Sequence, residues 1–424
     1  MGRRPFLTLA CIVTALGLLF AGSASAEFRA AIAVRCVTPE PLLPVSGGVG
    51  PSNPTTRKMG ELTVRALVLE QDGTRIAICS TDFLGFPGVL CEKIRAQVSR
   101  VPAANILIGA THTHSAPDCY GFPDREGKTS CDLAYLDSVC AALAGAIDAA
   151  AAGLQPAAVR IATGNAQGKI AYNYYAETLY DPRCHVVQVV DRDRNPIATL
   201  VNYACHPEVL GADQGILSPD FVGPLYERIE ARGGGVGLFM NSALGGMVTA
   251  DCRGPDGKDV RTCDECIRIG HLLADETLRI VSNAAIQEDP ALVCESAIVR
   301  LPVENDMLRT VVQRSPLGFT LDDDGHIATR IHVVNLGDAQ MATMPGEAMP
   351  NIGYYLKRKM HGRHNFLFGL TNDAFGYILT KEDFDSFDRY NYITRTCLCE
   401  RTGEILVRRL LELADACSRP TAGR

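Results

Sequence analysis

The chain has 424 residues, of which 47% are hydrophobic and 21% are charged. This is the composition of a globular protein, and it excludes wholesale disorder, collagen-like structure and low-complexity structure. The formal charge is −7, from 41 basic and 48 acidic residues without a basic block, so we expect no nucleic-acid partner.

The first 26 residues are typical of a secretory signal peptide. Two arginines precede an apolar stretch over residues 6–20, and Ala24-Ser25-Ala26 then provides a cleavage site. A membrane anchor is the alternative, but the apolar stretch is short for a span. We therefore expect residues 1–26 to be removed and residues 27–424 to be secreted or periplasmic.

No later segment is predicted to cross a membrane. The alanine-rich residues 133–154 are interrupted by Asp137 and Asp148, which favours a packed helix. An exported chain with 15 cysteines after the signal peptide has an odd number of thiols, and the connectivity of any disulfides stays open. Cysteines that lie near each other in sequence, and so could pair, are Cys119 and Cys131, Cys252 and Cys263, and Cys397 and Cys399.

Strand-like and helix-like stretches alternate along the whole chain. Strands over residues 62–70 and 74–81 flank Gln71-Asp72-Gly73, which predicts a hairpin. The other predicted elements are a helix over 89–101, a strand over 105–111, a helix over 133–151, strands over 158–163, 185–190 and 196–203, a helix over 220–232 begun by Ser218 and Pro219, a strand over 236–241, a helix over 265–283, strands over 294–303, 331–336 and 340–344, and helices over 351–360 and 404–416. Strict βαβ alternation is missing, so we expect one large α/β domain of mixed β-sheets with flanking helices.

The most informative local motif is Thr-His-Thr-His-Ser-Ala-Pro over residues 111–117, directly after the apolar run 106–110. In an extended segment His112 and His114 would point the same way. One imidazole could then bind a metal while the other reaches a substrate. Two structural histidines in a turn are the alternative.

Three further candidates follow β-like runs. His206 precedes a proline after residues 197–203, Glu347 follows residues 340–344, and Tyr377 ends the segment that begins after residues 366–369. Each has an ordinary explanation when taken alone, namely a structural histidine, a helix cap and a core aromatic. A catalytic zinc typically has three protein ligands, which combine histidine with a carboxylate, and one water.

Taken in order, these segments resemble the catalytic domain of the neutral/alkaline non-lysosomal ceramidase family. The likeness runs from about residue 29 to residue 413. It rests on the T-H-T-H-S-x-P motif, the His-Pro after a strand, the Pro-Gly-Glu that contains Glu347, and the N-x-[AFY]-x-x-Y segment that ends at Tyr377. The resemblance implies a large mixed α/β domain and hydrolysis of the amide of N-acylsphingosine.

The resemblance also implies roles for individual residues. His112, His206, Glu347 and Tyr377 would hold a catalytic zinc ion, with Tyr377 also in contact with the reacting groups. His114 would face the developing oxyanion as a catalytic residue. The expected partner is a lipid-like or N-acyl amide substrate.

The chain departs from the family pattern in three ways. A G-D-V-[SN]-P-like segment appears here with Met247 in place of the acid, and an N-R-R-like segment appears as Asn173-Tyr174-Tyr175, without an arginine that would help to bind the substrate or its anion. We also expect no C-terminal immunoglobulin-like domain. These changes spare the predicted zinc ligands, so we expect a substrate that is smaller than ceramide or has a different headgroup, or a protein for which ceramide is a poor substrate. The alternative is that another basic residue, Arg253 or Arg395, restores the contact.

Two alternatives stay open beside a ceramidase-like amidohydrolase. The first is a zinc hydrolase that acts on an ester, a lactone or a non-lipid amide. The second is an exported binding protein on a degenerate hydrolase scaffold, which need not hold zinc.

Overall fold

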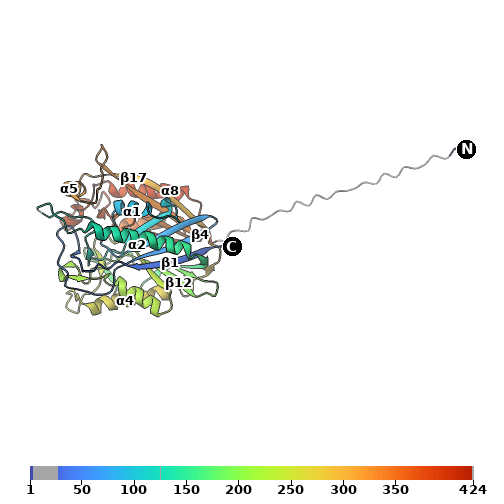
Figure 1. Ribbon diagram of the computed structural model, residues 1–424, viewed down its shortest axis with the longest axis horizontal. Coiled ribbons are helices and arrows are strands. Elements are labelled where there is room, and N and C mark those ends of the chain that lie inside the picture. The colour runs from blue at the N-terminus through green and yellow to red at the C-terminus, as the bar shows by residue number, and fades with distance from the viewer. Residues whose placement is uncertain (3–26, 125, 423–424) are drawn as a thin grey trace.

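The computed structural model describes residues 1–2, 27–124 and 126–422 (Figure 1). Residues 3–26 of the predicted signal peptide lie outside the described residues, so cleavage and export stay predictions. Three β-sheets are covered on their outer sides by helices, and each sheet is antiparallel except for one pair of parallel strands.

The first sheet has the strand order β6-β5-β4-β1-β8, and β5 and β6 are its parallel pair. Its strands are β1 (Arg29–Cys36), β4 (Thr63–Gln71), β5 (Thr74–Thr81), β6 (Ile106–Ala110) and β8 (Gln155–Pro156). Helices α1 (Gly88–Arg95) and α2 (Leu133–Ala152) pack along this side of the molecule. The predicted β4–β5 hairpin is confirmed: its Asp72 and Gly73 both have positive φ, as a two-residue hairpin turn requires.

The second sheet has the order β14-β12-β11-β9-β16, with β12 parallel to β14. It contains β9 (Ala158–Asn165), β11 (Arg183–Val190), β12 (Pro196–Tyr203), β14 (Val236–Asn241) and β16 (Ile286–Gln287). Helices α3 (Val222–Ala231) and α4 (Cys263–Val281) cover it, with α4 at the lower edge of Figure 1.

The third sheet has the order β17-β18-β19-β21, with β19 parallel to β21. Its strands are β17 (Leu292–Pro302), β18 (His326–Leu336), β19 (Ala339–Thr343) and β21 (His364–Phe368), and helices α6 (Pro350–Lys359) and α8 (Thr402–Ala416) pack against it. Short elements join the rest: β2 (Val45–Ser46) with β7 (Ala116–Pro117), β3 (Arg57–Lys58) with β13 (Ile216–Leu217), β10 (Ala171–Asn173) with β15 (Val248–Ala250), β20 (Glu347–Ala348) with β22 (Tyr377–Ile378), and helices α5 (Asp306–Arg314) and α7 (Asn391–Thr394).

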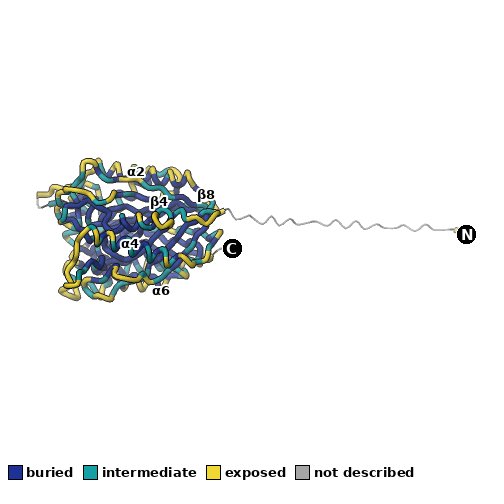
Figure 2. The backbone as a smooth tube through the Cα atoms, turned by 90° about the horizontal axis from the view of Figure 1, so that it is seen from below, coloured by how far each residue is buried: buried dark blue, intermediate teal, exposed yellow. Residues whose placement is uncertain are grey.

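All three sheets contribute to one apolar cluster in the interior, where Figure 2 shows the buried residues. Leu67 from the first sheet, Val187 and Leu238 from the second, and Phe366 and Phe368 from the third are all fully or almost fully buried there. Because all three sheets contribute to one core, their strand ends are held in fixed positions relative to one another. The predicted α/β fold with mixed sheets and flanking helices is confirmed.

Two predicted helix boundaries are wrong for local reasons. Helix α1 ends at Arg95 because the backbone amides of Ser99 and Arg100 donate to Asp148 of α2. Helix α3 begins only at Val222, because Asp220 adopts a left-handed φ of 53° and its carboxylate accepts from the Leu210 and Phe221 amides. Ser218 and Pro219 therefore precede the helix and do not start it.

Helix α2 alone among the described helices is long and apolar enough, by length and composition, to cross a membrane. It contacts β1 and β4, and its buried face includes Leu136, Leu143 and Ile147. That packing is the one expected of a helix that covers a sheet. None of the cysteines in the described part of the chain forms a disulfide, so the pairs suggested by sequence proximity are not bonded.

Candidate metal centre

The predicted site residues follow strands that belong to the parallel pairs of the three sheets. His112 comes two residues after β6, His206 three residues after β12, and Glu347 four residues after β19. Tyr377 follows β21 after a longer loop. The carboxyl ends of parallel strands are where α/β proteins usually bind their ligands.

His112 reaches the site by a left-handed backbone. Its φ is 74°, so the segment after β6 is not extended at this residue, contrary to the sequence prediction. Its backbone amide donates to the Phe83 carbonyl, and its Nδ1 contacts the Leu84 carbonyl oxygen. The ring orientation is therefore set by hydrogen bonds from the loop after β5, and not by strand alternation.

The tautomers of His112 and His206 follow from their partners. Nδ1 of His206 lies 2.8 Å from the Val248 carbonyl oxygen, and Nδ1 of His112 lies against the Leu84 carbonyl. A carbonyl oxygen can only accept, so Nδ1 carries a proton in both rings, and Nε2 presents a lone pair when the ring is neutral. Backbone carbonyls fix metal-ligating histidines in this way.

Both Nε2 atoms face the same carboxylate oxygen. Oε2 of Glu347 lies 3.1 Å from Nε2 of His206 and 3.6 Å from Nε2 of His112. Burial alone would raise the pKa of Glu347, but His112 and His206 outweigh it and hold the pKa well below its usual range. Glu347 therefore stays ionised, and positive charge must balance it beside the two Nε2 atoms, either as protons on the rings or as a metal ion. A set of imidazole and carboxylate donors of this kind fits a metal ion.

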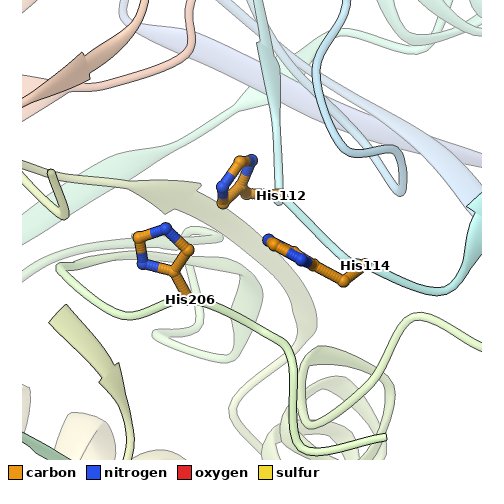
Figure 3. A group of neighbouring side chains, drawn as sticks. All are labelled: His112, His114 and His206. Atoms are coloured by element: carbon orange, nitrogen blue, oxygen red, sulfur yellow. The ribbon is translucent and has the colours of Figure 1, made fainter. Parts of the chain in front are cut away.

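His114 completes a group of three histidines whose nitrogens lie within 4.8 Å of one another (Figure 3). Its Nδ1 lies 3.7 Å from Oε2 of Glu208, too far for a hydrogen bond, and its Nε2 is buried without a partner. Burial lowers the pKa of His114 to about 3, so the ring is neutral. The unpartnered Nε2 is available to a metal or to a bound substrate.

Tyr377 is held next to Glu347 by the backbone. The two residues are partners in the parallel β20–β22 pair, and the buried Tyr377 hydroxyl donates to Sδ of Met247 at 2.9 Å. Burial and the neighbouring Glu347 raise the pKa of Tyr377 well above its ordinary value. The structure thus brings together all five residues that the sequence singled out.

Two residues were not singled out from the sequence. Nδ2 of Asn241, at the end of β14, donates to the Thr111 and Cys205 carbonyls and so joins the loops that carry His112 and His206. Glu208 faces His114 from two residues after His206. The His-Pro-Glu order was a usable signal for Glu208, whereas nothing local marks Asn241.

Two pockets meet at His114. An apolar pocket contains His112, Glu347 and Tyr377 and is walled by Leu84, Phe122, Leu308, Val311, Phe319 and Leu398. A polar pocket lies on the other side of His114 and is lined by Tyr172, Tyr174, Tyr175, Glu208, Asp259 and Arg261. His114 and Tyr392 line both, so the candidate metal centre lies where the two pockets join.

Comparisons with known proteins identify the fold. No protein-family model matches the chain. The crystal structure of neutral ceramidase from Pseudomonas aeruginosa superposes with a TM-score of 0.72 at 16% identity, over 94% of this chain and 76% of that one. A ceramidase complexed with C2 gives a TM-score of 0.71 at 16% identity, over 92% and 75%. The chain has the neutral ceramidase fold.

A curated relative shows the same likeness in sequence. Neutral ceramidase B of Dictyostelium discoideum is 28% identical over 185 residues. The match covers 38% of this chain and 26% of that protein, so it spans about a quarter of the relative. The resemblance to the neutral ceramidases that the motifs predicted is confirmed.

The backbone at Gly245 packs so closely against Glu347 that there is no room for a side chain. A Cβ on Gly245 would lie 2.3 Å from the Glu347 carbonyl oxygen, so Gly245→Ala must displace β20. We expect a loss of about 1–3 kcal/mol of stability and weaker metal binding, measured by denaturation and by metal titration. Gly145→Ala, at an exposed position of α2 with no atom near the new Cβ, is the control and should be neutral or slightly stabilising.

Proposed function

We propose that this protein is an exported zinc-dependent hydrolase that cleaves the amide bond of ceramide or of a related N-acyl amide. The observation that carries the proposal is the convergence of His112, His206 and Glu347 at the junction of an apolar and a polar pocket. The neutral ceramidase fold supports amide hydrolysis, and the N-terminal 26 residues support export.

We propose that His112, His206, Glu347 and Tyr377 hold the zinc ion. A mixed set of imidazole and carboxylate donors is typical of catalytic zinc. When bound, zinc polarises a carbonyl group and makes a water molecule nucleophilic at neutral pH.

The chain's own residues supply orientation and proton movement. His114 donates from Nε2 to the amide oxygen as negative charge develops on it, which requires the tautomer that carries its proton on Nε2. The water oxygen bonds to the carbonyl carbon, the C–N bond breaks, and the leaving nitrogen takes a proton from the water. Glu208, on the polar-pocket side of His114, is the carboxylate placed to carry that proton.

The second candidate substrate is an N-acyl amide that has one alkyl chain and a small or polar amine half. The arginine that the family pattern carries is replaced by Tyr174 and Tyr175, and Arg253 is not free to substitute for it. The Arg253 guanidinium is bound to Asp251 and Glu177 and lies 3.8 Å from the Tyr172 ring centre. Ceramide would therefore lose a charge-assisted hydrogen bond in this pocket, whereas an amide with a small or polar amine need not depend on it.

The test is hydrolysis by metal-defined protein. Protein stripped with a chelator should be inactive on fluorogenic N-acyl amides, and one equivalent of zinc should restore activity. A parallel panel of esters and lactones with the same acyl chain decides between amide and ester substrates. Stoichiometric zinc with ester turnover alone would favour the ester hydrolase, and protein that binds no zinc would support the binding-protein alternative.

A further inference from the structure

We infer that the polar pocket selects substrates whose amine half carries a positive charge, so that the preferred substrate is a single-chain N-acyl amide of a diamine or polyamine. This inference rests on the proposed function, because it assigns the two halves of a hydrolysed amide to the two pockets. The acyl chain would occupy the apolar pocket and the amine half the polar one.

The apolar pocket suits an alkyl chain. Its walls come from aliphatic and aromatic side chains, including Leu308, Val311 and Phe319 of α5 and the loop after it. The metal-side residues His112, Glu347 and Tyr377 lie in the same pocket. A carbonyl group at these residues, with its chain along the apolar walls, places the amide nitrogen toward His114 and the polar pocket.

The polar pocket has an excess of negative charge. Arg261 is its one basic lining residue in the described chain, and both of its terminal nitrogens bind Asp213. Neither Glu208 nor Asp259 forms an ion pair with a lysine or arginine anywhere in residues 27–124 and 126–422. Two carboxylates of the pocket that opens from the catalytic junction therefore have no direct ion pair with a lysine or arginine of the described residues, although Arg261 interacts with Glu208 at longer range.

The tyrosines of this pocket add to the attraction for a cation. Arg253 already lies over the Tyr172 ring and Arg389 over the Tyr175 ring, which leaves Tyr174 and Tyr392 as the lining tyrosines without an arginine over their rings among the described residues. Burial and Asp259 raise the pKa of Tyr172 to about 12, so its hydroxyl stays protonated and polar. Aromatic faces beside carboxylates are the surroundings that favour an alkylammonium group.

The same lining disfavours other amine halves. A sphingoid base carries a second long alkyl chain. The apolar side chains of the polar pocket, among them Val49, Val209 and Met247, alternate with carboxylates and tyrosines and form no continuous apolar wall. An N-acyl amino acid would bring a carboxylate against Glu208 and Asp259. The negative charge of the pocket therefore repels an anionic amine half as well as attracting a cationic one.

The experiment compares four amides with one C12 acyl chain on zinc-loaded protein. The amine halves are 1,4-diaminobutane (cationic), 4-aminobutanol (neutral), 4-aminobutyrate (anionic) and sphingosine. We expect kcat/KM for the cationic amide to exceed that of the neutral one by about tenfold, to fall toward it in high salt, and to be lowest for the anionic amide. Equal values for the cationic and neutral amides, or a preference for the sphingosine amide, would overturn the inference while leaving amide hydrolysis intact.

A charge-neutralising variant tests the pocket itself. Asp259→Asn should lower the cationic-to-neutral ratio of kcat/KM about two- to fivefold, as expected for an exposed charge. Asp256→Asn, on the same loop but outside the pocket lining, is the matched control and should leave the ratio unchanged. If both variants lowered the ratio equally, the preference would come from the net negative charge of the whole surface, which would contradict binding of the cation in this pocket.

Binding separates this inference from the proposed function. Sulfonamide analogues with the C12 chain and either the 4-aminobutyl or the 4-hydroxybutyl group cannot be hydrolysed, and calorimetry on wild type and Asp259→Asn gives their affinities. Preferential binding of the cationic analogue without turnover of any amide would refute hydrolysis and retain the cation site. Turnover without preferential binding would refute the cation site alone.

Discussion

His206→Ala is expected to bind no zinc and to show no measurable amide hydrolysis, whereas His114→Ala is expected to keep its zinc and lose about 10²–10³ in rate. His206 directs Nε2 at the Glu347 carboxylate and is locked there by the Val248 carbonyl. Removing it takes away a ligand, and His112→Ala should behave in the same way. His114 has no such backbone lock, and its proposed contact is with the substrate.

Zinc content by mass spectrometry and single-turnover rates distinguish the two outcomes. His185→Ala is the matched control, since it removes a buried imidazole that contacts Thr163 and Phe366 outside the histidine cluster. That variant should retain stoichiometric zinc. Loss of zinc from His114→Ala, whose nitrogens are also within reach of the other two rings, would show that His114 is a ligand and would reverse its assigned role.

Asp181→Asn is expected to destabilise the protein by about 3–5 kcal/mol at pH 7. Oδ2 of Asp181 lies 3.0 Å from Nζ of Lys357, and both side chains are only 1% exposed. Lys357 also contacts Oγ of Ser242, directly after β14. The substitution leaves the Lys357 ammonium buried without its counter-ion, because an amide cannot neutralise it.

The same pair predicts how stability depends on pH. Burial would raise the pKa of Asp181, but Lys357 and Arg183 outweigh it and hold the pKa well below its usual range. A lowered folded-state pKa means that this stabilisation is present above the unfolded pKa of about 3.9 and is lost as the pH falls below it. The difference in unfolding free energy between wild type and Asp181→Asn should therefore narrow in acid.

Urea denaturation followed by circular dichroism suits this measurement, because the chain contains no tryptophan. Asp275→Asn is the control for removing a carboxylate from an arginine pair. Its partner Arg228 and Asp275 itself are both substantially exposed, so the cost should stay below about 1 kcal/mol. A similar cost for the two variants would mean that burial of the Lys357 pair contributes nothing.

Much of the fold could be predicted from local pattern. The strands at residues 185–190 and 196–203 form β11 and β12 with the expected tight connection, and the Asp-Gly turn gives the β4–β5 hairpin. Strand β1, over Arg29–Cys36, was not predicted, because an arginine at each end and alanines between give a weak strand pattern. It becomes a strand by pairing with β4 along its whole length.

The site was predicted in composition more completely than in geometry. The motifs named the residues that converge, but the reason given for His112 and His114, an extended backbone, is wrong because His112 has a positive φ. What aligns the rings is contact with distant carbonyls, at Leu84 and Val248, and the amide of Asn241. Such contacts depend on which strand ends meet in space, and no local pattern encodes them.

The scattering of the proposed ligands over three sheets has a consequence for how the protein matures. His112, His206 and Tyr377 can meet only after loops spanning most of the chain have closed, and such non-local contacts form late and slowly. In an incomplete or partly folded chain, the proposed ligands therefore lie apart and do not form a metal site. Binding of the proposed ion would then be the final step of maturation, and by mass action it would favour the completed fold over every partly folded form.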